Sequence, residues 1–466
     1  MLKLMWGGGL LVGNFTDASI KDGVSICNNK CTSKGGAVNI TGTTGTAVLN
    51  IDGGSIYSNT ALNEDGTSGS GGAIFVSGGT VNFNSGVIGG DSVTYANTAY
   101  DGGAIYLDEN CTFNHNGGIV KNNKANNGAG VYLAKESSNY NLADGSLSYN
   151  TAANFGGGIY QLDGIASLSG GSLSSNTSNL GMSNGACIAY SSDGSSKLIL
   201  KDNINIASSD DILSFSMAPV YIGGNITTDD AITVWFYTPS TSDDPAGKTI
   251  LKNFDDTDYV KDIYSKFQYK YTDYYKIDSK GIVRKIINSP SIESLKPSGI
   301  TLPSSSFTLP ADQTELTLST AAELKQISLW SKSSTLSGYK FIMTDDIDLE
   351  NASDYEPIGY PSVNGKPFQG IFDGNGYEIK NLYVNTPSVS NSGLFGKCQD
   401  ALIQNLTVSG EVIGKDYVGG IVGSIFRYTE HFENYGIQNC VSYVNVTGTE
   451  AAGGIVGHVY NSEIIK

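Results

Sequence analysis

A cluster of three small residues followed by an aliphatic residue recurs through the first half of this 466-residue chain. The six clusters start at Gly35, Gly71, Gly102, Gly128, Gly156 and Gly185, in steps of 36, 31, 26, 28 and 29 residues. A repeat of this length is too short to bury a core of its own, so successive repeats must stack on one another. The spacing therefore predicts a solenoid in this part of the chain.

Each repeat holds short strand-like runs bounded by Gly or Asx turns. The segment Gly53–Ala61 places an aliphatic residue before an Asx turn, and alternating runs such as Thr80–Asn84 lie between the turns. Roughly three strands per repeat predict an all-β fold, a right-handed parallel β-helix (β-solenoid). Its coils should lie ~4.8 Å apart, the spacing of neighbouring strands in a sheet.

In such a fold each position of a coil faces the same position of the next coil, so equivalent side chains stack. We expect an aliphatic ladder inside and a stack of Tyr106, Tyr132 and Tyr160. An asparagine ladder should also form at one turn. Its members are Asn29, Asn59, Asn97, Asn123, Asn150 and Asn176.

Composition excludes several classes of partner. The net charge is −17, and the only arginines are Arg284 and Arg427. Nucleic-acid binding requires a basic surface that displaces counterions, so we expect no nucleic-acid partner. Anionic membrane surfaces are disfavoured for the same reason. No segment reaches the ~20 apolar residues that cross a bilayer, so we expect no membrane span in this chain.

The repeats divide the chain into two β-helix modules. We expect the first over residues 1–287, with an irregular cap from about residue 200 to 287, and a Pro/Ser-rich linker over 288–318. The second module, 319–466, opens with the capping box Thr320-Ala321-Ala322-Glu323. The short amphipathic helix that follows should cover the edge of the first coil.

A second repeat series runs through the C-terminal module. The segments Ser392–Gly396, Gly419–Gly423 and Gly453–Gly457 align with one another. A second set, Ile379–Leu382, Ile403–Leu406 and Ile437–Cys440, is interleaved with them. The series breaks off at Lys466 part-way through a coil, so we expect a truncated module within a longer natural protein.

No residue pattern predicts catalysis or metal binding, so we expect no catalytic, cofactor-binding or metal-binding residues. The acidic pair Asp210-Asp211 lacks the histidine and arginine that polygalacturonase-like enzymes need, and the pair Asp345-Asp346 precedes an expected strand. We expect His115, His431 and His458 to be isolated surface or turn residues. Cys31 takes a position that alanine fills in sister repeats, which indicates small buried thiols rather than metal ligands.

Tyrosines are concentrated near the end of the first module. Exposed aromatic rings there could stack on sugars, although strand-forming tyrosines in an end cap are the favoured interpretation. The residues are Tyr259, Tyr264, Tyr269, Tyr271, Tyr274 and Tyr275.

The Gly-Gly-Ala-(Ile/Leu/Val) series over residues 7–190 resembles the repeats of bacterial polymorphic outer-membrane-type surface proteins. The run from Asp345 through Gly359 and Phe368–Gly376 is similar to the GLUG-motif region of bacterial surface proteins, including the non-catalytic part of IgA-protease-like chains. Both resemblances imply parallel β-helices displayed outside the cell, often on adhesins. Neither implies catalytic residues.

We therefore expect a non-enzymatic extracellular protein of the bacterial cell surface, a β-solenoid stalk or adhesin. Its partner would be a host receptor or a glycan. The alternative is a carbohydrate-active β-helix enzyme, a polysaccharide lyase or glycoside hydrolase, with an unrecognised acidic site. Fold alone does not decide between these two classes.

Overall fold

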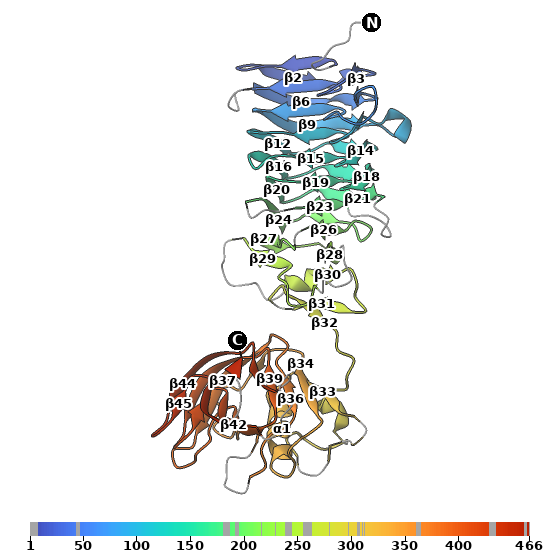
Figure 1. The fold of residues 1–466 in the computed structure, drawn as a ribbon. Coiled ribbons are helices and arrows are strands. Elements are labelled where there is room, and N and C mark those ends of the chain that lie inside the picture. The colour runs from blue at the N-terminus through green and yellow to red at the C-terminus, as the bar shows by residue number, and fades with distance from the viewer. Residues whose placement is uncertain are drawn as a thin grey trace. The chain divides into compact units, whose positions relative to one another are not determined.

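The computed structural model describes residues 8–42, 47–179, 187–191, 195–215, 217–228, 230–237, 245–254, 263–278, 280–296, 298–304, 308–309, 311, 313–359, 365–427, 435–460 and 464–465. Contacts divide the chain into two compact units, unit 1 (Met1–Ile286) and unit 2 (Ile287–Lys466). The protein is all-β, with 49% strand and 5% helix, and stacked parallel coils form a β-solenoid of about 13 turns (Figure 1). The predicted fold class is confirmed.

Unit 1 is built from three parallel sheets that run along the stack of coils. The first contains β1 (Leu10–Val12), β5 (Val38–Thr41), β8 (Ile74–Ser77), β11 (Ile105–Leu107), β15 (Val131–Leu133), β19 (Ile159–Gln161), β23 (Ile188–Tyr190), β26 (Ile212–Ser214), β28 (Ile232–Phe236) and β30 (Phe267–Tyr269). The third contains β4 (Lys30–Cys31), β7 (Thr60–Ala61), β10 (Thr98–Ala99), β14 (Lys124–Asn127), β18 (Thr151–Phe155) and β22 (Thr177–Ser178).

The second sheet carries two strand positions per coil, which merge in the long strands β6 and β9. Its strands are β2 (Asp17–Lys21), β3 (Ser25–Cys27), β6 (Ala47–Tyr57), β9 (Gly79–Gly89), β12 (Cys111–His115), β13 (Ile119–Lys121), β16 (Ser138–Leu142), β17 (Ser146–Ser148), β20 (Ile165–Leu168), β21 (Ser172–Ser174), β24 (Lys197–Asp202), β25 (Asn205–Ile206), β27 (Val220–Ile226) and β29 (Leu251–Asn253).

The glycine clusters place the first and third sheets against each other at a corner of the coil. A Cβ added to Gly72 would lie 2.2 Å from the carbonyl oxygen of Gly103 and 2.6 Å from the backbone nitrogen of Thr98. Both atoms belong to the backbone of the next coil, so only glycine allows this approach. The residue after the cluster then points inward, and Ile74 pairs with Ile105 in a fully buried aliphatic ladder.

The coils of unit 1 continue beyond the clear repeat. We expected an irregular cap from about residue 200 to 287, but β24, β27 and β29 extend the second sheet, and β26, β28 and β30 extend the first. Buried aliphatic and aromatic residues such as Val234 and Phe236 replace the glycine signature there. An antiparallel hairpin, β31 (Tyr275–Ile277) and β32 (Val283–Lys285), follows the last of these coils.

Unit 2 has four parallel sheets. One contains β33 (Glu315–Leu318), β34 (Lys340–Met343), β36 (Ile371–Asp373), β39 (Leu402–Gln404), β43 (Gly436–Gln438) and β47 (Ile464–Ile465), and a second contains β35 (Ile347–Asp348), β37 (Glu378–Asn385), β40 (Thr407–Ile413) and β44 (Val441–Thr447). The others contain β38 (Phe395–Gln399), β42 (Val422–Phe426) and β46 (Val456–Tyr460), and β41 (Val418–Gly419) and β45 (Ala452–Gly453).

One of the two sequence alignments in unit 2 is confirmed and the other is partly wrong. Phe395 pairs with Val422, which pairs with Val456, as the glycine series predicts. Ile403 pairs with Ile437 and with Phe372, whereas Ile379 lies in another sheet and pairs with Ile347. The Ile-x-Asn pattern therefore recurs on two different faces of the coil, because each face has its own turn after a buried aliphatic residue.

Described residues of the segment expected as a linker, 288–318, pack on unit 2 instead. Ile292 and Leu302 are buried in its core. The backbone N–H of Ile292 donates to the carbonyl of Thr317, and the N–H of Thr317 donates to that of Pro290. This segment therefore covers the edge of β33, a role that we had expected for the helix.

The predicted helix is present as α1 (Ala321–Ser331), and its capping box is confirmed. Thr320 Oγ1 accepts the N–H of Glu323, and Glu323 Oε2 accepts the N–H of Thr320. Leu324 and Ile327 on its apolar side are fully buried in the core of unit 2.

Candidate functional site

The predicted asparagine ladder forms inside unit 1. Asn123 shows its pattern: its Nδ2 donates to Asn150 Oδ1 at 2.9 Å and to the carbonyl of Ile88 at 3.0 Å. Asn150 Oδ1 also accepts the backbone N–H of Asn123 at 3.0 Å. The same contacts join Asn29 to Asn59, Asn59 to Asn97, Asn97 to Asn123, and Asn150 to Asn176. The ladder is structural, because its amides from Asn59 to Asn176 are almost fully buried.

Asp210 takes the next position of this ladder. Its carboxylate accepts the backbone N–H groups of Ser175 and Asn176 and the Nδ2 of Asn176. The side chain is 1% exposed. Asp211 is not part of the ladder, and its carboxylate forms an ion pair with Lys270 at 2.6 Å. Burial raises the pKa of Asp211, and the Lys270 ammonium opposes that rise. The acidic pair therefore does not form a two-carboxylate site.

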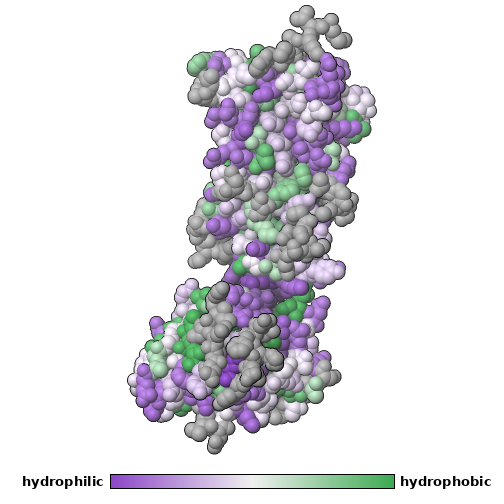
Figure 2. All heavy atoms as spheres, viewed as in Figure 1, coloured by the Kyte–Doolittle hydropathy of each residue, from purple (hydrophilic) through white to green (hydrophobic). Residues whose placement is uncertain are grey.

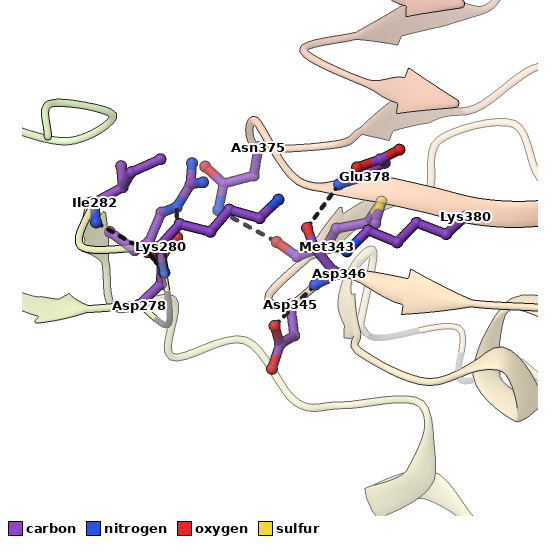
Figure 3. Close-up of polar contacts among 10 residues, drawn as sticks. Asp278, Lys280, Ile282, Met343, Asp345, Asp346, Asn375, Glu378 and Lys380 are labelled. Atoms are coloured by element: carbon purple, nitrogen blue, oxygen red, sulfur yellow. Dashed lines mark hydrogen bonds and ion pairs between the residues drawn. The ribbon is translucent and has the colours of Figure 1, made fainter. Parts of the chain in front are cut away.

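The second acidic pair, Asp345-Asp346, makes structural contacts in unit 2. Asp346 accepts the backbone N–H of Glu378 at 2.9 Å and pairs with Lys380 at 3.0 Å (Figure 3). In unit 1, the same kind of contact ties the hairpin together, where Asp278 accepts the backbone N–H of Ile282 at 2.9 Å (Figure 3). Asp346 therefore joins its own coil to the next one, and Asp278 holds the turn of the hairpin.

The position of His115 was predicted wrongly. It is fully buried at the end of β12 rather than at the surface. Its Nε2 lies 3.3 Å from the carbonyl of Gly118, which can only accept, so Nε2 carries the proton and Nδ1 accepts from the Tyr140 hydroxyl at 2.9 Å. Burial lowers the pKa of His115 to about 4. His458 is exposed beside Tyr417, and His431 lies outside the described residues.

The cysteines behave as small core residues. Cys31 is fully buried and pairs with Ala61, as the repeat alignment predicts. All six thiols are free. Among the described residues, no three His, Cys, Asp or Glu side chains gather into a group that could hold a metal ion.

The tyrosine stack is confirmed on the outer side of the first sheet. The rings of Tyr106 and Tyr132 are 4.9 Å apart and nearly parallel, and Tyr160 follows at 5.1 Å. Burial raises the pKa of Tyr106 to about 12. Tyr160 is tilted by 60° from Tyr132 and stacks on Phe155. Phe75 stacks on Tyr106, so each of the three rings packs against neighbouring aromatic rings.

The tyrosines at the end of unit 1 are mixed in character. Tyr269 is buried in the core, whereas Tyr271 and Tyr274 are 44% and 65% exposed. Tyr271 packs edge-on against Trp235, with ring centroids 6.2 Å apart. Tyr259 and the side chain of Tyr264 lie outside the described residues.

Unit 2 has a cleft of about 450 Å³ beside α1. Its described lining includes Leu309, Leu329, Trp330 and Tyr339, and Lys332 is the one charged residue among them. The lining holds no carboxylate or histidine in the described residues, so it offers no acid–base pair of the kind that sugar-cleaving enzymes use.

The outer side of the second sheet carries a feature that sequence reasoning missed. Asn82 Nδ2 donates to Asn50 Oδ1, Asn114 Nδ2 to Asn82 Oδ1, and Asn141 Nδ2 to Asn114 Oδ1, each at 2.9 Å. A second, parallel file (a row of side chains along the stack) lies two residues further along each strand. Asn84 donates to Asp52 at 2.8 Å, and Asn116 donates to Asn84 at 3.0 Å. The alternation in Thr80–Asn84 and Cys111–Asn114 was the available signal.

The surface around these files is mainly polar. On the face shown in Figure 2, hydrophobic residues over unit 1 form separated patches among hydrophilic ones. Large hydrophobic side chains that are exposed include Tyr149 and Leu162. None of the described helices is both long and apolar enough to cross a membrane.

Comparisons with known proteins give two partial relatives. A protein described as "Putative Gly-rich membrane protein" from Evansella cellulosilytica is 33% identical over 111 residues, 22% of this chain and 12% of that protein. Halomucin from Haloquadratum walsbyi is 35% identical over 106 residues, 20% of this chain and 1% of that protein. The chain thus matches only a small part of either relative. No protein-family model and no solved structure matches it.

Proposed function

We propose that this chain is a non-enzymatic, extracellular part of a bacterial surface protein, a β-solenoid stalk or adhesin that binds a host receptor or a glycan through its outer faces. The observation that carries the proposal is that the candidate acidic and imidazole groups make structural contacts. Asp210 ends the ladder and Asp211 forms an ion pair, whereas Asp346 joins two coils and His115 makes a core contact.

The resemblance to surface-protein repeats and to the GLUG-motif region supports this role. The name of the Evansella relative, which refers to a membrane protein, is consistent with a location in the cell envelope. A stack of coils held by internal ladders is also well suited to a stalk, because each coil contacts only its neighbours and the length grows with the repeat number.

Incubation of the purified chain with pectin, alginate and host glycans tests the proposal. We expect retention of the protein on at least one glycan, without release of reducing or unsaturated ends. Turnover of any polymer would overturn the non-enzymatic role and favour the alternative carbohydrate-active enzyme. Antibodies against unit 1, added to intact cells of the source organism, should label the cell surface. Labelling only after lysis would contradict the extracellular location.

A further inference from the structure

The outer side of β9, β12 and β16, together with Asn116 directly after β12, forms a regular array of uncharged polar side chains. We call it the amide face; its members are Thr80, Asn82, Asn84, Thr112, Asn114, Asn116, Asn139 and Asn141. Register holds them in files: Thr80 pairs with Thr112, and Asn82 with Asn114, which pairs with Asn141. The array therefore repeats at the strand spacing of ~4.8 Å along the stack and every second residue along each strand.

The hydrogen bonds within the files fix the amides before any ligand arrives. Asn82 uses one N–H toward Asn50 and one acceptor position toward Asn114. A primary amide has two N–H donors and two lone pairs, so each such residue keeps a second donor and a second acceptor position. Asn82 and Asn114 are partly exposed, and Asn84 and Asn116 are exposed. The rotamer entropy that binding normally costs is already lost in the folded protein.

We infer that the amide face binds an extended, neutral, hydroxyl-rich polysaccharide. Each hydroxyl is both a donor and an acceptor, and therefore matches an amide that offers one of each. A polymer with a regular repeat can contact several coils at once, so weak contacts add up. The inference rests on the proposed function, in that it names the ligand class and the surface of the stalk.

Charge favours a neutral polymer over an anionic one. The amide face carries no charge of its own, and the protein has a net charge of −17. Pectate, alginate or nucleic acid would approach this acidic protein without a cation on the face to hold them. The nearest charged members of the files, Asp52 and its neighbour Lys21, lie at one end, on β6 and β2.

Retention of the whole chain on microcrystalline cellulose, on chitin and on alginate beads tests the inference. We expect retention on cellulose or chitin and none on alginate. The double variant Asn82→Val/Asn114→Val removes the amides but keeps side chains suited to strands, and should weaken retention at least tenfold. The matched control Thr60→Val/Thr151→Val changes the outer side of the third sheet and should bind as the wild type does.

A second double variant tests whether misfolding could explain a loss of retention. Asn84→Lys/Asn116→Lys alters only exposed positions and should also abolish retention, by placing bulky cations on the face. Wild-type retention on cellulose and chitin by both double variants, or no retention of the wild type on either polymer, would overturn the inference. Different results would contradict the proposed function, namely turnover of a polymer or antibody labelling only after lysis.

Discussion

Asn176 donates its side-chain N–H to Asp210 Oδ1 across 3.2 Å, and its backbone N–H reaches the same oxygen at 2.9 Å. Every amide of the ladder donates toward the following coil, so Asn176, the last amide, needs an acceptor there. That acceptor does not have to donate in turn, because no further amide follows it. A carboxylate meets this requirement, because it only accepts. Asp210 therefore ends the ladder where the glycine repeat also fades.

The first prediction concerns this terminal carboxylate. Asp210→Ala leaves the N–H groups of Ser175 and Asn176 and the Asn176 amide without their acceptor, so the free energy of unfolding should fall by roughly 2–4 kcal/mol. Asp210→Asn keeps one acceptor oxygen and should lose less. Chemical denaturation measures both, with the exposed Asp17→Asn as control. Equal stability of Asp210→Ala and wild type would show that water replaces the carboxylate.

The second prediction concerns the middle of the ladder. Asn150→Ala removes the acceptor of Asn123 and the donor to Val120 and Asn176, all at buried positions. Unpaired buried groups cost ~1–3 kcal/mol each, so the denaturation midpoint should fall while the m-value stays the same. Asn29→Ala, at the more exposed start of the ladder, should lower the midpoint less. A larger effect at Asn29 would contradict a ladder stabilised by burial.

The third prediction is a pH dependence from His115. Its folded-state pKa of about 4 lies below the ordinary value near 6.5, so only the unfolded chain takes up the proton between these values. The contribution of His115 to stability is therefore complete above pH 6.5 and is lost as the pH falls toward 4, by roughly 3 kcal/mol in all. The facing groups are Tyr140 and the more distant carboxylate of Asp144.

Thermal unfolding between pH 4 and 7 measures this effect. His115→Gln, which cannot titrate, should reduce the slope of stability against pH in that window. His458→Gln changes an exposed ring and should leave the slope as in the wild type. Parallel curves for His115→Gln and wild type would mean that the buried imidazole does not control the acid response.

Features that recur in every coil could be predicted from the sequence, whereas residues with a role that occurs only once were missed or misplaced. Asn59 and Asn150 were found because their spacing follows the coil. Asp210 was missed as the end of their ladder, because a carboxylate replaces an amide after the glycine clusters have ended. His115 could have been placed correctly, since Cys111, Phe113 and His115 alternate along one strand and all three are buried. Because histidine is polar, this alternation was not interpreted as three buried positions.

The expected linker shows that amino-acid composition alone does not predict whether a segment packs on a domain. Prolines and serines predicted an extended spacer, but Ile292 and Leu302 are buried in the core of unit 2. The amide face was also overlooked, because Thr and Asn on alternate positions are typical of any solvent-facing strand. Only the register of three successive coils shows that these side chains bond to one another.

The fourth prediction tests the close approach of neighbouring coils. Gly72→Ala places a methyl group 2.2 Å from the backbone oxygen of Gly103, which cannot move without shifting the coil. We expect a loss of more than about 2 kcal/mol in the free energy of unfolding, as in other overpacked sites. Gly13→Ala is the matched control, because no atom lies within 4 Å of its added methyl group. Similar losses in both variants would show that the contact with Gly103 is not the cause, because Gly→Ala in open space lowers the entropy of the unfolded chain and should not destabilise the protein.

The fifth prediction concerns the thiols. Cys31, Cys111, Cys187 and Cys398 are buried, and burial, with a smaller effect of Asp108, raises the pKa of Cys111 to about 12. Because burial keeps the reagent away from them, a disulfide reagent at pH 8 should leave these four thiols unmodified in the native protein and modify all six after unfolding. Cys27 is partly exposed and should account for the fastest native reaction, which Cys27→Ser should remove. Rapid native modification of Cys111 would mean that the coil around β12 opens readily in solution.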